Sequence, residues 1–126
     1  MAMLACSRSR IGVDIERIDE SKLEAVAAAC HQVEIEVLER ADDPATLFAQ
    51  IWTAKEACLK ADGRGLTIDP RTLCVVDDHG CPAELVQIPG SAPWQIQHVA
   101  VDSHHVAALA SKAGDAVDVI QRHWFG

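Results

Sequence analysis

Residues 43–66 read DPATLFAQIWTAKEACLKADGRGL. Asp43 supplies a side-chain acceptor for a helix N-cap, Pro44 suits the first helical position, and Gly63 can adopt the positive φ at which helices end. The stretch therefore predicts a helix from about Pro44 to Asp62. Its apolar residues recur at helical spacing, which predicts a face packed against a core: Leu47, Phe48, Ile51, Trp52, Cys58 and Leu59.

Charged side chains interrupt this apolar face. Lys55 lies in its middle, where an ammonium group costs free energy unless it reaches solvent or an anion, and such local conflicts are typical of functional sites. Glu56 and Lys60 are four residues apart. They form either an ordinary ion pair on a solvated flank or a pair that serves chemistry. The helix alone does not decide between the two.

Length and composition limit the class of protein. The 126 residues suit a single domain, which we expect to span 1–126, and 49% of them are hydrophobic. The formal charge of -8 disfavours nonspecific binding to nucleic acid or to an anionic membrane. No apolar run suits a signal peptide or a membrane span. The five cysteines form no C-x-x-C pair, which indicates reduced residues in a cytoplasmic protein.

Residues 10–18 alternate apolar and polar side chains, as a β-strand does. Asp14 and Glu16 are two residues apart, so on a strand their carboxylates point the same way and can converge on one hard cation. The alternative is a polar outer face on an edge strand. The strand by itself leaves both interpretations open.

Two short helices are expected between these segments. Ser21 and Glu24 form a capping-box pattern, which predicts a helix over 22–30. A second helix is expected over 32–40. It turns its apolar residues inward and its acidic residues to solvent, namely Glu34, Glu36 and Glu39.

The sequence after Gly65 is typical of β-structure. Apolar and β-branched segments separated by turn residues predict strands over 72–76, 83–88, 94–101 and 105–110. Residues 115–125 fit a strand or a short helix equally well. One strand, then helices, then antiparallel strands is the order of an α+β domain, with helices packed on a small antiparallel sheet.

Two of these segments resemble the signature motifs of a known family. The 4'-phosphopantetheinyl transferase superfamily has motifs similar to Gly12-Val13-Asp14-Ile15-Glu16 and to Trp52-Thr53-Ala54-Lys55-Glu56-Ala57 with Lys60 and Gly63-Arg64-Gly65-Leu66. The acidic pair and the tryptophan resemble the Sfp-type enzymes more closely than the small holo-acyl-carrier-protein synthases. The match covers only the second of the two similar halves of an Sfp-type enzyme.

The resemblance implies transfer of the phosphopantetheine arm of coenzyme A to a serine of an apo acyl or peptidyl carrier protein, with release of adenosine 3',5'-bisphosphate. It implies Asp14, Glu16 and Glu56 as Mg²⁺ ligands, and Glu56 also as the base for the serine hydroxyl. Lys60 would meet the pyrophosphate, and Lys55 would line the same pocket. Gly63 and Gly65 would end the helix and, secondarily, hold the phosphates.

The missing half leaves alternatives. We expect self-association, as in the small synthases, because a half-fold otherwise exposes an apolar face. A neighbouring copy would then supply His104 or His105 to the 3'-phosphate, although both histidines also fit a plain exposed turn. The second alternative is a noncatalytic coenzyme A-binding half-domain that needs a partner lobe. A metal-dependent nuclease is a third, which the acidic charge disfavours.

Overall fold

The computed structural model describes residues 10–115 of the chain. The described strands form one antiparallel sheet in the order β1-β4-β3-β2. The elements are β1 (Ile11–Arg17), the 3-10 helix η1 (Glu20–Ala25), α1 (Val26–Ala29), α2 (Gln32–Arg40), α3 (Pro44–Asp62), the 3-10 turns η2 (Gly65–Thr67) and η3 (Pro70–Thr72), β2 (Leu85–Val86), β3 (Trp94–Ala100) and β4 (His105–Lys112). This arrangement confirms the expected α+β domain.

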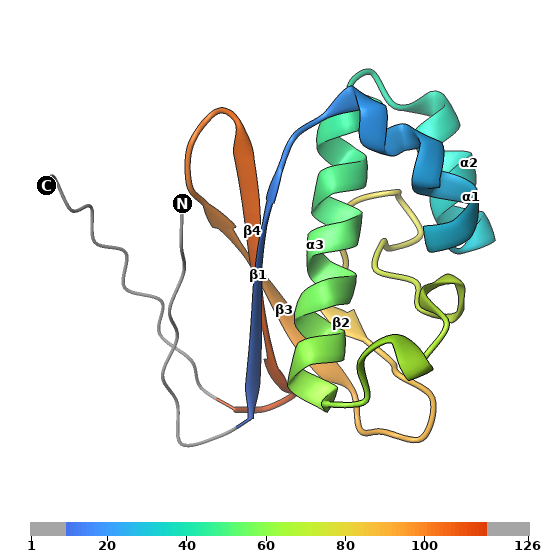
Figure 1. The fold of residues 1–126 in the computed structure, drawn as a ribbon. Coiled ribbons are helices and arrows are strands. Elements are labelled where there is room, and N and C mark those ends of the chain that lie inside the picture. Colours follow the sequence, from blue (N-terminus) through green and yellow to red (C-terminus); the bar gives the residue numbers. More distant parts are fainter. Residues whose placement is uncertain (1–9, 116–126) are drawn as a thin grey trace, which may run out of the picture.

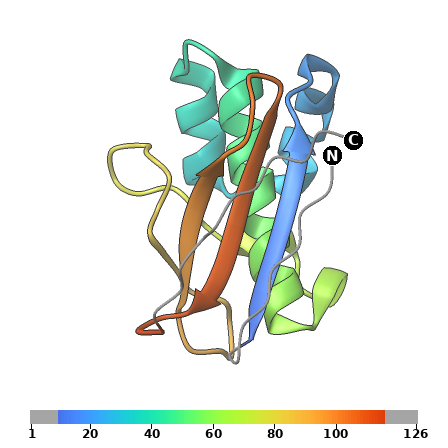
Figure 2. The ribbon, with the colours of Figure 1, turned by 90° about the vertical axis from the view of Figure 1, so that its left-hand side faces the viewer.

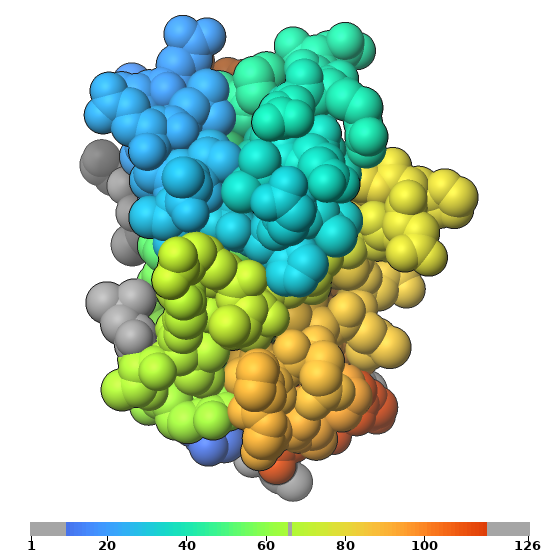
Figure 3. All heavy atoms as spheres, turned by 90° about the vertical axis from the view of Figure 1, so that its right-hand side faces the viewer, coloured from blue at the N-terminus to red at the C-terminus, as the bar shows by residue number. Residues whose placement is uncertain are grey.

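The long helix α3 lies against one face of the sheet, and the shorter helices lie on the far side of α3 (Figure 1). On that side, α1, α2 and the segments that follow α3 form an outer layer (Figure 3). The core lies between the layers, and its most buried apolar residues are Ala57, Cys58, Leu73, Ile88, Ala108 and Ala110. Within residues 10–115, neither α3 nor its shorter neighbours have the length and apolar character that crossing a bilayer requires.

Both ends of α3 lie where the sequence predicts. Asp43 accepts hydrogen bonds from the backbone N–H of Thr46 at 3.2 Å and from its hydroxyl at 2.7 Å. Gly63 adopts a φ of 86°, which residues with a side chain rarely adopt, and its N–H donates to Leu59 O at 3.0 Å. The predicted helix over 44–62 is therefore confirmed, as is the helix over 32–40.

The predicted helix over 22–30 is only partly right. Asp19 is the N-cap, because its carboxylate accepts from Ser21 N at 2.9 Å. The segment that follows begins as the 3-10 helix η1 and becomes α-helical only at Val26. The capping role predicted for Ser21 is wrong, since an acidic residue two positions earlier already occupies it.

Of the two strands predicted between the long helix and residue 90, only a small part forms. Segment 83–88 shortens to β2, and segment 72–76 contributes only an isolated bridge between Val76 and Pro82. The reason is that the N–H of Val75 donates to the Glu34 carboxylate at 2.8 Å instead of to a strand. The predicted strands at 94–101 and 105–110 form as β3 and β4. Residues 116–125 lie outside the described part of the chain.

Strand β1 lies close against α3 at Gly12. A Cβ built on Gly12 would overlap Ala57 O and would lie 2.5 Å from Ala61 N. The φ of Gly12 is not positive, so space and not backbone conformation requires the glycine here. This close approach brings Asp14 and Glu16, which share the same face of β1, against the helix.

No described helix covers the opposite face of the sheet (Figure 2). The strand register places mostly apolar side chains on this outer face: Ile11, Val13, Ile15, Val99, Ala107 and Leu109. The three residues from β1 are half-buried. Gln95, Gln97 and Ser111 lie on the same face, and Ala107 and Leu109 are already buried within the chain. The apolar side chains that remain partly exposed here are mainly those of β1.

Candidate active site

Asp14 on β1 meets Lys60 on α3. Lys60 Nζ donates to Asp14 Oδ1 at 2.8 Å and to Val13 O at 3.3 Å. The Asp14 side chain is 8% exposed and the Lys60 side chain 52% exposed, so the carboxylate lies inside and the ammonium group at the surface. Lys60 of the helix therefore forms an ion pair with the strand. The charge of Asp14 also raises the pKa of Glu16 and of Glu56.

The charge of Asp14 disfavours ionisation of the two glutamates in this cluster, Glu16 and Glu56. Burial raises the pKa of Glu16, and a hydrogen bond and the charge of Asp14 raise it further, whereas Lys22 lowers it. Burial also raises the pKa of Glu56, with a further contribution from Asp14 and an opposing one from Lys60. Asp14 Oδ2 is buried and has no hydrogen-bond partner among the described residues. An unpaired buried carboxylate oxygen costs free energy, so a further positive charge at Asp14 Oδ2 would stabilise the cluster.

The donor chemistry of the cluster fits a divalent cation. Mg²⁺ prefers carboxylate oxygens, and Asp14 Oδ2 is an oxygen without another partner. A bound cation would favour the charged forms of Glu16 and Glu56 and so oppose the pKa shifts that burial causes. Over residues 10–115 no three acidic, histidine or cysteine side chains already converge as a metal-binding group. A cation would therefore have to draw these carboxylates together.

A second lysine, Lys22 of η1, reaches the same cluster. Its Nζ lies 3.4 Å from Glu16 Oε2 and 3.1 Å from Arg17 O. The turn after β1 folds η1 back over the end of the strand and so places Lys22 there. The sequence gives no periodic signal for such a turn, and the resemblance does not assign this residue a role.

The structure does not bring Lys55 to this cluster. Its side chain lies on the outer-layer side of α3 and pairs with Glu34 of α2, and both side chains are fully buried. The solvated position predicted for Glu34 is wrong. Each charge is compatible with the core only because the other one is present. One signal was available, because Glu34 lies four residues before Leu38 and so shares the buried face of α2.

The other predicted residues lie near the two ends of β1. Gly63 ends α3, where Arg10 donates to the last carbonyl of the helix at 2.7 Å. Gly65 has a φ of 56° and opens η2, and nothing lies within 4 Å of where its Cβ would be. His104 lies in the β3–β4 turn at the opposite end, and its backbone carbonyl accepts from Ile18 N at 2.8 Å. The glycines and His104 therefore flank the carboxylates from opposite ends.

The fold and the site together define an α+β domain in which an edge strand and a buried helix share an acidic, lysine-paired site. The profile of the 4'-phosphopantetheinyl transferase superfamily matches residues 10–110. Because this match covers most of the chain, the chain belongs to that superfamily.

Among solved structures, the holo-[acyl-carrier-protein] synthase of Thermotoga maritima has the same fold, with a TM-score of 0.64 and 14% sequence identity. The similarity covers 82% of this chain and 64% of that one. The chain thus spans less than two thirds of the length of this relative, and the likeness concerns the fold. A comparison with curated proteins found no significant match.

Proposed function

We propose that the chain transfers the 4'-phosphopantetheine arm of coenzyme A to a serine of an apo acyl or peptidyl carrier protein and releases adenosine 3',5'-bisphosphate. The observation that supports this most is the contact between Asp14 of β1 and Lys60 of α3, at 2.8 Å, beside Glu16 and Glu56. A pyrophosphate is bound by positive charge, which Lys60 can supply directly and the carboxylates can supply by holding a cation. Membership of the superfamily supports the class of reaction.

The reaction forms a bond between the serine Oγ and the phosphorus next to pantetheine. It breaks the bond from that phosphorus to the bridging oxygen of the pyrophosphate. We assign the serine proton to Glu56, the carboxylate of the second motif, which lies on α3 near Asp14 and Lys60. Lys60, with its half-exposed ammonium group, stabilises the charge that develops on the leaving oxygen.

Asp14, Glu16 and Glu56 are the residues that we assign to Mg²⁺. When bound, the ion neutralises phosphate charge and orients the pyrophosphate. Lys60 already occupies Asp14 Oδ1, whereas Asp14 Oδ2 is without a partner. Lys22 near Glu16 favours the charged form of that carboxylate, although burial and Asp14 have the larger effect and raise its pKa.

The carrier protein approaches, in this proposal, at the end of β1. Lys22 lies there, with its Nζ 3.1 Å from the backbone carbonyl oxygen of Arg17 and 3.4 Å from Glu16 Oε2. Arg64 lies beyond the C-terminal end of α3 and pairs with Asp62. The basic residues therefore do not form one continuous patch. A net charge of -8 makes the local positive charge beside Glu16 important for an acidic carrier.

We also propose that the chain acts as a homo-oligomer. On the outer face of the sheet the apolar side chains of Ile11, Val13 and Ile15 are half-buried, and a second copy that covers them would remove their exposed part from water. His104 or His105 of the neighbouring copy is then our candidate for the 3'-phosphate of coenzyme A. Asp102 orients the ring of His105, with 2.9 Å between Asp102 Oδ1 and Nδ1. Light scattering that finds only monomer at micromolar concentration would refute the oligomer.

The decisive experiment incubates the purified chain with coenzyme A, Mg²⁺ and an apo carrier protein and measures the intact mass of the carrier. We expect a gain of one phosphopantetheine that disappears when a chelator is added. Asp14→Asn and Glu56→Gln should each abolish the gain while the protein stays folded. A folded chain that binds coenzyme A without transfer would support the noncatalytic half-domain instead.

A further inference from the structure

Lys55 and Glu34 form a fully buried ion pair that the proposed reaction does not use. Both side chains are 0% exposed. Lys55 Nζ donates to Glu34 Oε1, to Ala29 O at 2.8 Å and to Pro70 O at 2.9 Å. An ammonium group has three protons, so every donor of Lys55 is in use.

Glu34 is also fully engaged. Its Oε1 accepts from His31 N at 2.8 Å, and its Oε2 accepts from Val75 N at 2.8 Å. The two side chains together join the end of α1, the start of α2, the turn η3 and the segment at Val75 to the middle of α3. Removal of either partner would leave an unpaired charge in the core, which is strongly destabilising.

A lysine that binds phosphate needs an accessible ammonium group. Lys60 has one, because its side chain is 52% exposed, whereas Lys55 is fully buried. To reach a phosphate, Lys55 would have to break its hydrogen bonds to three acceptors, which would leave the Glu34 carboxylate buried without a counter-charge. Any effect of Lys55 on the site is therefore exerted through other residues.

Two connections lead from this pair to the site. Glu56 follows Lys55 directly on α3, about 100° further round the helix, so a helix rotation that moves one moves the other. Ala29, which accepts from Lys55, ends α1, and α1 follows η1 without a break. The helix η1 carries Lys22, which lies 3.4 Å from Glu16.

We propose that Lys55 is a positioning residue. With Glu34 it forms a clamp that holds the outer layer on α3, while the contact at Gly12 holds β1 on the other side of the helix (Figure 1). The clamp thereby fixes the rotation of Glu56 toward Asp14 and the placement of Lys22 beside Glu16. The effect of the clamp on phosphopantetheine transfer rests on the proposed function. Its effect on Mg²⁺ affinity can be measured without any transfer.

The test uses Lys55→Met, Glu34→Met and the double variant. Arg71→Met is the matched control, because it removes a 60% exposed cation, paired with Asp69, from the neighbouring turn η3. We expect each single core variant to lower the melting temperature strongly and the double variant to recover much of the loss, since no buried charge is left unpaired. The control should melt like the wild type. Single variants that are as stable as the wild type would overturn the clamp.

The folded double variant separates positioning from phosphate binding. Calorimetry should find Mg²⁺ affinity reduced about tenfold, as for loss of a residue that orients metal ligands. Its affinity for coenzyme A without metal should equal that of the wild type. If coenzyme A binding is lost instead, Lys55 is a phosphate ligand. If Mg²⁺ binding recovers fully together with stability, the pair is merely structural. Either result overturns the proposal.

Lysine acetylation of the native wild-type protein is a second measurement, independent of how the variants fold. Peptide masses should show Lys60 and Lys22 modified and Lys55 unmodified until the protein is denatured. Modification of Lys55 as fast as Lys60 in the folded protein would overturn the proposal. If the wild type transfers nothing, the proposed function fails, while acetylation, melting and Mg²⁺ binding still decide on the clamp.

Discussion

Gly12→Ala tests the contact that sets the distance between β1 and α3. The added Cβ would lie 2.5 Å from Ala61 N, whereas ordinary contacts begin at 3.4 Å, so the strand must move by at least 0.9 Å (3.4 - 2.5). The overlap with Ala57 O requires still more. Overpacking of a core costs about 1–3 kcal/mol, and often more where backbone is involved. At about 4 °C per kcal/mol, we expect the melting temperature to fall by about 4–12 °C.

Calorimetric melting and the carrier-mass assay measure the two consequences of this substitution. Displacement of Asp14 from Lys60 by such a distance should reduce transfer by about a hundredfold. Val13→Ile is the control, because it adds one methylene to the same strand on the opposite, half-buried face. A Gly12→Ala protein that melts within about 2 °C of the wild type and transfers normally would refute the close packing of strand and helix.

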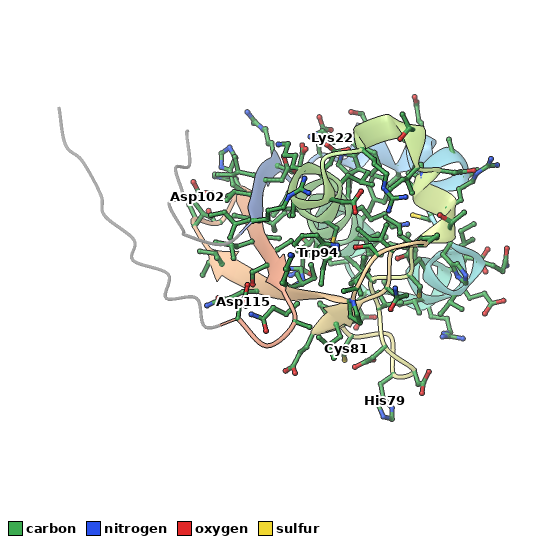
Figure 4. All side chains as sticks on the ribbon, turned by 90° about the horizontal axis from the view of Figure 1, so that it is seen from below. Lys22, His79, Cys81, Trp94, Asp102 and Asp115 are labelled. Carbon is green, nitrogen blue, oxygen red and sulfur yellow. The ribbon has the colours of Figure 1, made fainter. Side chains whose placement is uncertain are left out.

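Three further predictions concern charges and thiols. Lys60→Met leaves Asp14 buried and unpaired, so urea unfolding should show a loss of about 1–3 kcal/mol, partly recovered by Mg²⁺. Glu56→Gln should raise the melting temperature at pH 7 without metal. Because the pKa of Glu56 is raised in the folded protein, ionisation of Glu56 destabilises the wild type as the pH rises above the ordinary glutamate value of 4.5. Below that pH the variant and the wild type should therefore melt at the same temperature. A higher melting temperature of the variant at every pH would contradict this prediction. Cys58, whose pKa burial raises to about 12, should resist a thiol reagent in the folded protein, whereas Cys81 on the projecting loop (Figure 4) should react.

The helix over 44–62 and the strand of Asp14 are predictable because their signals are local. Asp43 and Gly63 mark the ends of α3 through their own backbone chemistry, and β1 alternates without interruption. Segment 72–76 has equally good strand composition. It could not be predicted correctly, since the donor at Val75 is used by a side chain 41 residues earlier.

The residues of the site also differ in whether local sequence signals predict their positions. Periodicity places Asp14 and Glu16 on one face of a strand and Glu56 and Lys60 on one side of a helix, and the resemblance joins the two sets. Lys55 conflicts with its apolar surroundings, and the sequence does not show what resolves the conflict. Its partner lies 21 residues away on another helix. Two buried charges that neutralise each other leave no pattern in either helix alone.

The pairing of β1 has a consequence for synthesis of the chain. β1 is an edge strand of the described sheet and pairs with β4, so that Ile11 lies opposite Ser111 and Arg17 opposite His105. The ribosome delivers β1 before α3, and β4 follows only after α3, β2 and β3. Pairings so distant in sequence also form slowly. A nascent chain therefore holds α3 with Glu56 and Lys60 before Asp14 has a sheet to join, and the acidic site is completed only after β4 has been made.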